Sequence, residues 1–342
     1  MLTLSIDALD RATWQRHAGG CPDLALPQSW AYGEAKVQGG PWHVERGVFH
    51  HDDGSIAGTV QVLLRPLPLG LPGGLAWVGR GPLRQRDGDE TDPRHILTLL
   101  AALRRHYVAE RGFYLRVAPP VADDGFGREA PPGFARTVSP GWASARINLT
   151  LSVEALRAGL QQKWRNVLNK AERGPVIVEP IAAIAGSAPF AAFLDDYRNF
   201  LAERQVATSV TPELLRVLAA ASGETLDLMA AHVAGAVIGW ALIARSGGTA
   251  EYLAGVVGEA GRRHGAGQSL LWQAMVSAKS RGCAVFDVGG LDPIVTPEGI
   301  RRFKEGLGGV PYRLTNEIEA VPAGPFGRLV RWRVGRARAA IQ

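Results

Sequence analysis

The two halves of the chain repeat one order of hydrophobic and polar positions. In each half, two apolar runs of strand length come before one amphipathic segment, and a further apolar run follows it. The runs are residues 56–64, 74–79 and 113–117 in the first half and residues 237–243, 250–255 and 285–288 in the second. Short apolar runs indicate strands, and the three-and-four spacing of apolar residues between them indicates helices.

The two predicted helices also end alike. Leu99-Leu100 and Arg111-Gly112 in the first half match Leu270-Leu271 and Arg281-Gly282 in the second at almost the same offset. A glycine after the last turn is the expected helix stop, because glycine accepts a left-handed backbone. The matching helix lengths and stops therefore predict an internal duplication.

This repeated order of strands and one helix is that of the GNAT (N-acetyltransferase-type) fold. We therefore predict an α/β (α+β) chain of two tandem GNAT-like domains, each a mixed, mostly antiparallel sheet flanked by helices. The domain boundary is expected near Arg146, after a loop rich in Pro and Gly, which gives domains over residues 1–146 and 147–310. A length of 342 residues is sufficient for two domains.

Residues 228–244 form the one long apolar stretch, interrupted only by the polar side chain of His232. A membrane-spanning helix needs about 20 such residues. This stretch is shorter and contains Gly235 and Gly239. We predict two buried strands with a turn near Ala234-Gly235.

Charge and composition narrow the choice of partners. The chain has 38 Lys and Arg against 32 Asp and Glu, and the resulting net charge of +6 favours nucleic acid, nucleotide-linked substrates or anionic lipid. Two cysteines, Cys21 and Cys283, are too few for a disulfide framework or a four-ligand zinc site, and we predict no metal. No Walker loop, G-x-S-x-G or H-E-x-x-H motif occurs. The N-terminus does not resemble a signal peptide, so we expect a cytoplasmic protein.

Three motifs carry a family resemblance. They are QSWAYGEAK at residues 28–36, KWRN and KAERG at residues 163–166 and 170–174, and a closing segment at residues 299–309 that contains Phe303-Lys304. Together they resemble the Fem family of aminoacyl-tRNA-dependent peptidyltransferases, which build peptidoglycan cross-bridges from two GNAT-like domains. The motifs span nearly the whole chain. The helical-hairpin insertion of some members is absent, so the chain is similar to the compact members that act on a nucleotide-linked precursor.

The resemblance implies an activity and its partners. The enzyme would move an amino acid from a charged tRNA to the stem-peptide amine of a peptidoglycan precursor, with the charged tRNA as co-substrate and no other cofactor. The precursor would be a UDP-linked or lipid-linked muramyl-pentapeptide. Residues from about 311 to 342 would return to complete the first domain.

The resemblance also implies roles for individual residues. Lys36 and Arg204 would contact the precursor's diphosphate. Tyr252, on an expected central strand, would either line the acceptor site or belong to the core. Lys304 would stabilise the developing oxyanion while Phe303 shapes the pocket, so the substrate would span Lys36 and Lys304. Asp287 ends a strand beside Gly289-Gly290, where it would either accept the amine's proton or cap the turn.

The segment from Ser152 to Arg173 is predicted to be one amphipathic helix with Ser152 as its cap. Lys163, Arg165 and Lys170 are the predicted tRNA contacts on this helix, because phosphates require closely spaced cations. A solvated basic face explains the same pattern equally well.

Residues 262–267 indicate a second possible activity. Arg262-Arg263-His264-Gly265-Ala266-Gly267 fits R-x-x-G-x-G, the acetyl-CoA pyrophosphate loop of GNAT enzymes, in which helix N-terminal amides bind phosphate. The alternative is therefore an acyl-CoA-dependent N-acyltransferase with acetyl-CoA as its donor. A third possibility is a protein that binds RNA or a membrane surface on a degenerate transferase fold.

The tail from Gly327 carries five arginines among apolar residues. This pattern indicates either a basic amphipathic helix that touches anionic lipid or RNA, or a frayed terminal helix. We expect a monomer in the cytoplasm, with peripheral contact to the inner face of the membrane through this segment.

Overall fold

The computed structural model describes residues 2–6, 9–85, 93–127, 129–182, 185–205, 208–222 and 225–339. The chain forms two compact units, one of residues 1–142 with 313–342 and one of residues 143–312. The boundaries expected from the sequence, after residues 146 and 310, lie a few residues from these. Each unit has its own sheet and its own hydrophobic core.

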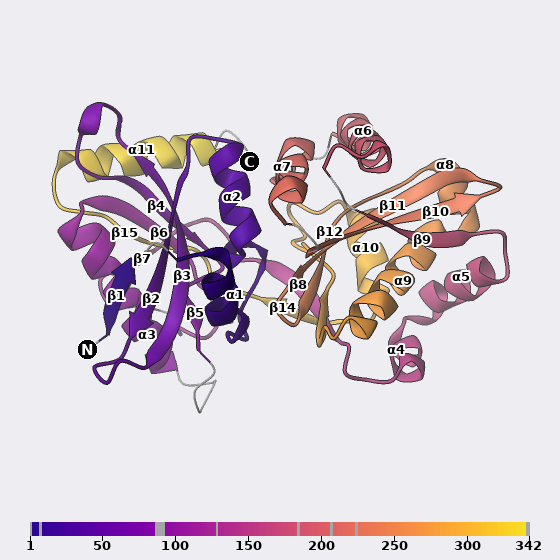
Figure 1. Cartoon of the computed structure of the whole chain (residues 1–342), viewed down its shortest axis with the longest axis horizontal. Helices are drawn as coiled ribbons and strands as arrows, with labels where there is room; N and C mark the ends of the chain where they lie inside the picture. The colour runs from indigo at the N-terminus through magenta and orange to yellow at the C-terminus, as the bar shows by residue number, and fades with distance from the viewer. Residues whose placement is uncertain are drawn as a thin grey trace. The chain divides into compact units, whose positions relative to one another are not determined.

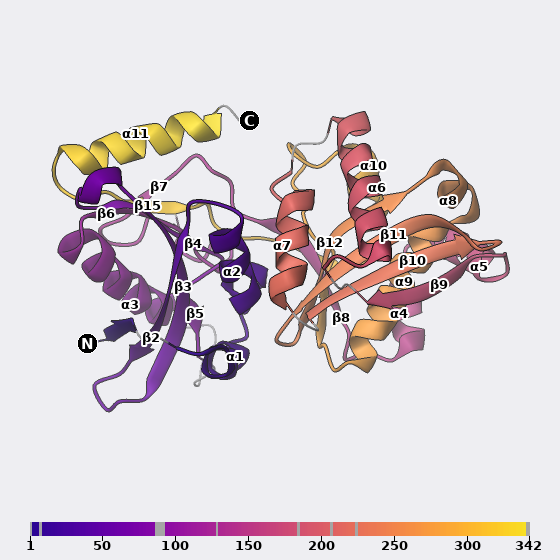
Figure 2. The same cartoon turned by 45° about the horizontal axis from the view of Figure 1, so that its top comes forward.

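The first unit is built on one long sheet with helices on both faces. The sheet order is β1 (Thr3–Ile6), β2 (His43–His50), β3 (Ile56–Pro66), β4 (Gly74–Gly79), β6 (Phe113–Ala118), β15 (Ile318–Ala320) and β7 (Ala135–Arg136), with β5 (Leu83–Arg84) paired to β3. The pair β4–β6 is parallel. Figures 1 and 2 show α3 (Pro93–Leu103) on one face, and α1 (Arg11–Gly19) and α2 (Trp30–Gln38) on the other.

The second unit repeats this plan. Its sheet runs β14 (Val310–Arg313), β8 (Ala143–Asn148), β13 (Val285–Asp287), β12 (Thr249–Val257), β11 (Ala236–Ser246), β10 (Leu226–Val233) and β9 (Ile177–Ala182). Helix α9 (Ala266–Ser280) covers one face, while α6 (Ala188–Arg204) and α7 (Pro212–Ser222) cover the other (Figure 2). Two short helices, α8 (Glu259–His264) and α10 (Glu298–Glu305), flank α9 and β13 in the chain.

The duplicated order is confirmed. In each unit two antiparallel strands lead into a helix, and the strand after that helix pairs in parallel with the strand before it: β4 with β6, and β12 with β13. The predicted glycine stops have left-handed backbone, with φ of 69° at Gly112 and 82° at Gly282. The predicted turn in the long apolar stretch joins β10 to β11 and has positive φ at both Ala234 and Gly235.

One predicted helix is wrong. The segment that follows Ser152 forms two helices, α4 (Val153–Gly159) and α5 (Gln162–Glu172), and Leu160 between them has extended backbone. The chain breaks here because the amide of Gln161 donates to the carbonyl of Gly306 at 3.0 Å instead of continuing the helix. The predicted cap is confirmed, since the Ser152 hydroxyl accepts a bond from the Ala155 amide at 3.2 Å.

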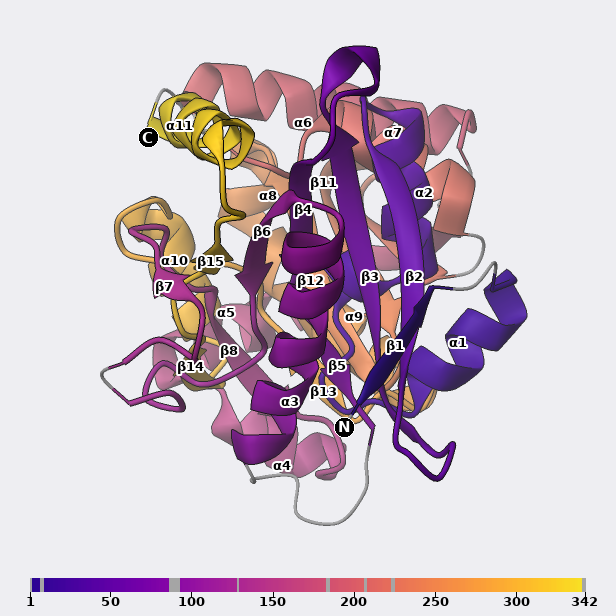
Figure 3. The same cartoon turned by 90° about the vertical axis from the view of Figure 1, so that its left-hand side faces the viewer.

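The C-terminal segment belongs to the first sheet. β15 pairs with both β6 and β7, and α11 (Pro325–Ala339) packs on β4 and β6, as Figure 3 shows from the side. No helix in the described part of the chain is both long and apolar enough to cross a membrane.

Candidate active site

The parallel strands β12 and β13 end their pairing at Glu251 and Asp287. Beyond this point the chain turns through Gly289, whose φ is 74°. A Cβ atom at residue 289 would lie only 2.5 Å from the carbonyl oxygen of Tyr252, so the turn requires glycine. This pairing stops partway along β12 and at the carboxyl end of β13, and we call the residues around that point, Glu251, Tyr252, Asp287, Gly289 and Gly290, the notch. Ligands of α/β folds commonly bind where parallel strands end.

Lys304 on α10 points into this notch. Its Nζ atom donates to the carbonyl oxygen of Gly290 at 3.2 Å and lies 5.3 Å from the centre of the Tyr252 ring. The side chain is 9% exposed. Burial lowers the pKa of Lys304 to about 8, although the nearby carboxylates of Asp287 and Glu251 oppose this effect by favouring the ammonium. The notch therefore holds a mostly protonated but poorly solvated cation at neutral pH.

Asp287 is fully buried and holds the turn in place. Its carboxylate accepts bonds from the Gly289 amide at 2.9 Å, from the Ser144 hydroxyl and from the Tyr312 hydroxyl. Of the two roles considered from the sequence, turn capping is what the geometry shows. Three donors therefore hold its two oxygens within the turn.

Phe303 lies beside Lys304 in sequence, but its ring points elsewhere. The ring centre is 6.1 Å from that of Trp164 on α5, and the ring edge lies 3.2 Å from where a Cβ would stand on Gly267. Phe303 therefore joins α10 to α5 and to the start of α9. This packing fixes the position of α10, and with it the position of Lys304.

The glycine turn of the R-x-x-G-x-G sequence is also covered by α5. Gly265 has φ of 72° and precedes α9, and a Cβ there would lie 2.9 Å from the Val167 side chain and 3.2 Å from that of Ala171. Gly265, Ala266 and Gly267 are all buried. The amides at the start of α9 are thus enclosed by the chain itself.

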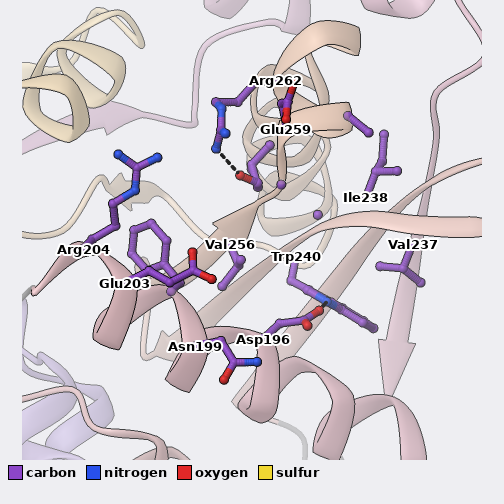
Figure 4. A pocket seen from close by; sticks show the side chains of 15 residues that line it. Asp196, Asn199, Glu203, Arg204, Val237, Ile238, Trp240, Val256, Glu259 and Arg262 are labelled. Atoms are coloured by element: carbon purple, nitrogen blue, oxygen red, sulfur yellow. Dashed lines mark hydrogen bonds between the residues drawn. The ribbon is translucent and has the colours of Figure 1, made fainter.

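A cavity of about 520 Å³ lies on the face of the second sheet that α6 covers. It is lined by α6, by the ends of β11 and β12, and by α8 (Figure 4). Arg204, the last residue of α6, lines it together with Arg262 of α8. The Arg262 guanidinium donates to the carbonyl of Val257 at 2.9 Å, and the Trp240 indole donates to Asp196 at 2.8 Å. Three carboxylates complete the charged lining: Asp196, Glu203 and Glu259.

The sequence did not indicate this grouping. In the sequence, Arg204 and Arg262 belong to separate motifs, and Trp240 lies within a predicted strand. No linear spacing joins residue 196 to residue 240 or residue 262. The contact depends on α6 packing across β11 and β12, which only the folded chain shows.

The predicted tRNA contacts on α5 separate into two kinds. Lys163 and Lys170 are exposed, and neither has an acidic partner in the described residues. The half-buried Arg165 instead donates to the carbonyl of Ala158 at 3.1 Å, which ties α5 to the end of α4.

The N-terminal motif is explained residue by residue in the first unit. Gln28 is fully buried and bonds the backbone of both Gln61 on β3 and Gly79 on β4. Ser29 caps α2 through the Tyr32 amide at 3.2 Å. Gly33 allows the Gln61 and Arg46 side chains to approach, since a Cβ there would lie 2.4 Å and 2.7 Å from them.

Lys36 is the member of this motif that the packing leaves without a structural task. It lies in the last turn of α2, half-buried, with Nζ 5.7 Å from the centre of the Tyr32 ring. No carboxylate pairs with it among the residues that the structure describes. Burial lowers the pKa of Lys36, so the site disfavours the bare cation and would favour an anionic ligand beside it.

The described residues contain no candidate metal site. Within the described ranges, no three His, Cys, Asp or Glu side chains are grouped so as to hold a metal ion.

Comparison with known proteins agrees with the duplicated fold. Residues 156–305, most of the second unit, match the family model of the acetyltransferase (GNAT) domain. Among solved structures, the chain is similar to FemX, with 15% identity, a TM-score of 0.78 and coverage of 95% of this chain and 99% of that one. It is also similar to a tandem GNAT protein from the clavulanic acid biosynthesis pathway, with 14% identity, a TM-score of 0.50 and coverage of 95% and 99%. No curated protein matches the sequence.

These findings confirm the tandem GNAT fold predicted from the internal repeat. The match of the second unit to the acetyltransferase domain also supports a transferase of acyl groups.

Proposed function

We propose that this chain is an aminoacyltransferase that moves an amino acid from a charged tRNA to the stem-peptide amine of a peptidoglycan precursor. The observation that carries the proposal is the Lys304 ammonium, buried in the notch between β12 and β13 beside the glycine turn. The likeness of the whole chain to FemX supports this choice among acyl transfers.

The reaction suits such a site. The substrate amine attacks the carbonyl carbon of the aminoacyl ester, a C–N bond forms, and the ester C–O bond to the tRNA ribose breaks. The amine's proton leaves with the departing ribose oxygen. The ester is already activated, so the enzyme needs to align the reactants and stabilise the oxyanion, and a poorly solvated ammonium is effective at the second task.

The enclosed glycine turn favours charged tRNA over coenzyme A as the donor. A coenzyme A diphosphate would be expected on the amides at the start of α9. Val167, Ala171 and Phe303 pack against that turn. Using it for coenzyme A would require α5 and α10 to move away from α9.

The candidate cations are proposed to serve two different substrates. Lys36 and Arg204 are proposed to contact the precursor's diphosphate. Lys163 and Lys170 are proposed to contact tRNA phosphates, because both are exposed on one helix and neither pairs with a carboxylate among the described residues. Arg165 is assigned to holding α5 on α4.

Kinetics of three variants test the assignment. Lys304→Met should lower kcat by about a hundredfold or more, the usual effect of removing one oxyanion contact, and leave precursor binding nearly unchanged. Lys304→Arg, which keeps the charge, should retain part of the lost rate. Lys36→Met should raise the KM for the precursor by about tenfold, the effect of one charged hydrogen bond, with kcat little changed. Equal, small effects in all three variants would contradict the assignment.

A further inference from the structure

Helix α11 has an unusual composition for a helix on a protein surface. Its sequence, PFGRLVRWRVGRARA, contains five arginines and no acidic residue. It is the last helix of the chain and packs on β4 and β6 of the first sheet. The activity proposed above assigns it no task.

Only some of the side chains of α11 pack against the first sheet. Val330 is 7% exposed and Val334 is half-buried, and both lie on the face that packs against the sheet. Arg331 pairs with the buried carboxylate of Glu319 on β15. These contacts fix the helix on the first unit and thereby determine which face points away.

The outer face is apolar and basic at once. Trp332 is 56% exposed, Leu329 45% and Phe326 41%. The Arg336 guanidinium lies 5.0 Å from the centre of the Trp332 ring. Arg328, Arg333 and Arg336 have no acidic partner in the part of the chain that the structure describes.

A second exposed apolar element lies at the same side of the first unit. The connection from β3 to β4 carries Leu69, which is 96% exposed, and Leu71, which is 42% exposed. Leu69 has φ of 61°, a strained conformation for a leucine, and lies in the short turn Pro68–Gly70 between the two strands. This tip and α11 appear at the same side in Figures 1, 2 and 3.

We propose that α11 and the β3–β4 tip dock together on an anionic membrane surface. The arginines would bind lipid phosphates, while Trp332, Leu329 and Leu69 enter the boundary between headgroups and acyl chains. A lipid surface fits better than RNA because it offers a partner for both kinds of side chain. RNA phosphates would pair with the arginines but leave the exposed leucines in water.

Vesicle co-sedimentation with the full-length chain tests this proposal. The chain should bind vesicles of mixed phosphatidylglycerol and phosphatidylcholine much more strongly than vesicles of phosphatidylcholine alone. Trp332→Ser, Leu69→Ser and the pair Arg333→Gln with Arg336→Gln should each weaken binding, the arginine pair by on the order of tenfold. The matched control is Arg16→Gln with Arg216→Gln, which removes two exposed arginines elsewhere and should leave binding unchanged.

All of these side chains are exposed, so the variants should fold, and circular dichroism checks this. The proposal is overturned if anionic vesicles do not bind the chain, or if the control pair weakens binding as much as the α11 pair. Binding of single-stranded RNA that depends on Arg333 and Arg336, without vesicle binding, also overturns it. The test does not use transferase activity, so its outcome is separate from that of the proposed function.

Discussion

Lys304 is one of five lysines in the chain, which otherwise uses arginine for its positive charges. The distinction matters because burial can lower the pKa of lysine towards neutrality, whereas arginine stays protonated. The notch between β12 and β13 does lower it, to about 8. Three of the remaining lysines, Lys36, Lys163 and Lys170, are those proposed to contact substrate phosphates.

The pH dependence of kcat/KM tests the role of Lys304. The ammonium form is the active one, so activity should be present below about pH 8 and be lost as the pH rises through that value. Deprotonation of the attacking substrate amine produces a separate rise of kcat/KM with pH. Lys304→Arg should remove the falling limb, because its guanidinium does not titrate in this range. A falling limb that persists in Lys304→Arg would contradict the role.

Gly289 tests the geometry of the notch. Gly289→Ala places a Cβ at 2.5 Å from the Tyr252 carbonyl oxygen and forces positive φ on alanine. We expect a loss of about 2 kcal/mol in the free energy of unfolding, together with reduced activity. Gly299→Ala is the control in α10, where the added Cβ meets nothing within 4 Å. Chemical denaturation should show Gly299→Ala to be neutral or slightly stabilising, and equal losses in the two variants would contradict this account.

At the level of single residues, sequence predicted the features that local chemistry determines. Gly112, Gly282 and Ser152 were assigned correctly because a helix stop or a cap depends on a few neighbouring residues. The task of Phe303 was not predictable, since its partners are Trp164 and Gly267. Those contacts exist only once three helices have packed together.

At the level of elements, α5 carries the exposed lysines proposed to contact tRNA and also packs against α10, the helix that carries Lys304. Trp164 and Leu168 bury one side of it, and Lys163 and Lys170 are exposed on the other. The sequence predicted this amphipathic character but not the break before Gln161, because Leu160 continues the apolar spacing. The break depends on a bond to Gly306, far away in the chain.

Salt dependence tests the proposed tRNA contacts on α5. Lys163→Gln with Lys170→Gln should weaken tRNA binding and reduce the slope of log affinity against log salt by about 1.5 to 2, as expected for two lost phosphate contacts. Precursor binding should not change. Arg16→Gln with Arg216→Gln again serves as the charge-matched control. An unchanged slope in the α5 pair would place the tRNA elsewhere.

At the level of the whole molecule, the chain leaves its first sheet, builds the second unit, and returns to the first. β15 completes this return between β6 and β7, and Ile318 within it is fully buried. The internal repeat predicted two similar domains, because both halves carry the same order of elements. It did not predict β15, which pairs antiparallel with β6 as β8 pairs with β13 but comes from the other end of the chain. Only the family resemblance implied that this segment returns to the first domain.

Ile318→Ala tests whether β15 stabilises the first unit alone. The cavity should cost about 2–5 kcal/mol of stability, and the loss should be confined to the first unit. Hydrogen exchange should accelerate in β4 and β6 and stay unchanged in β11 and β12. Val321→Ala, at a residue that is 37% exposed, should have little effect. Equal acceleration in both sheets would show that the two units unfold together.

The mass of the product identifies the acyl donor most directly. The purified chain is incubated with a UDP-linked muramyl-pentapeptide and either a mixture of charged tRNAs or acetyl-CoA, and the product is weighed. We expect the precursor to gain the mass of one amino-acid residue with charged tRNA and to gain no mass with acetyl-CoA. An acetyl gain with no response to tRNA would contradict it.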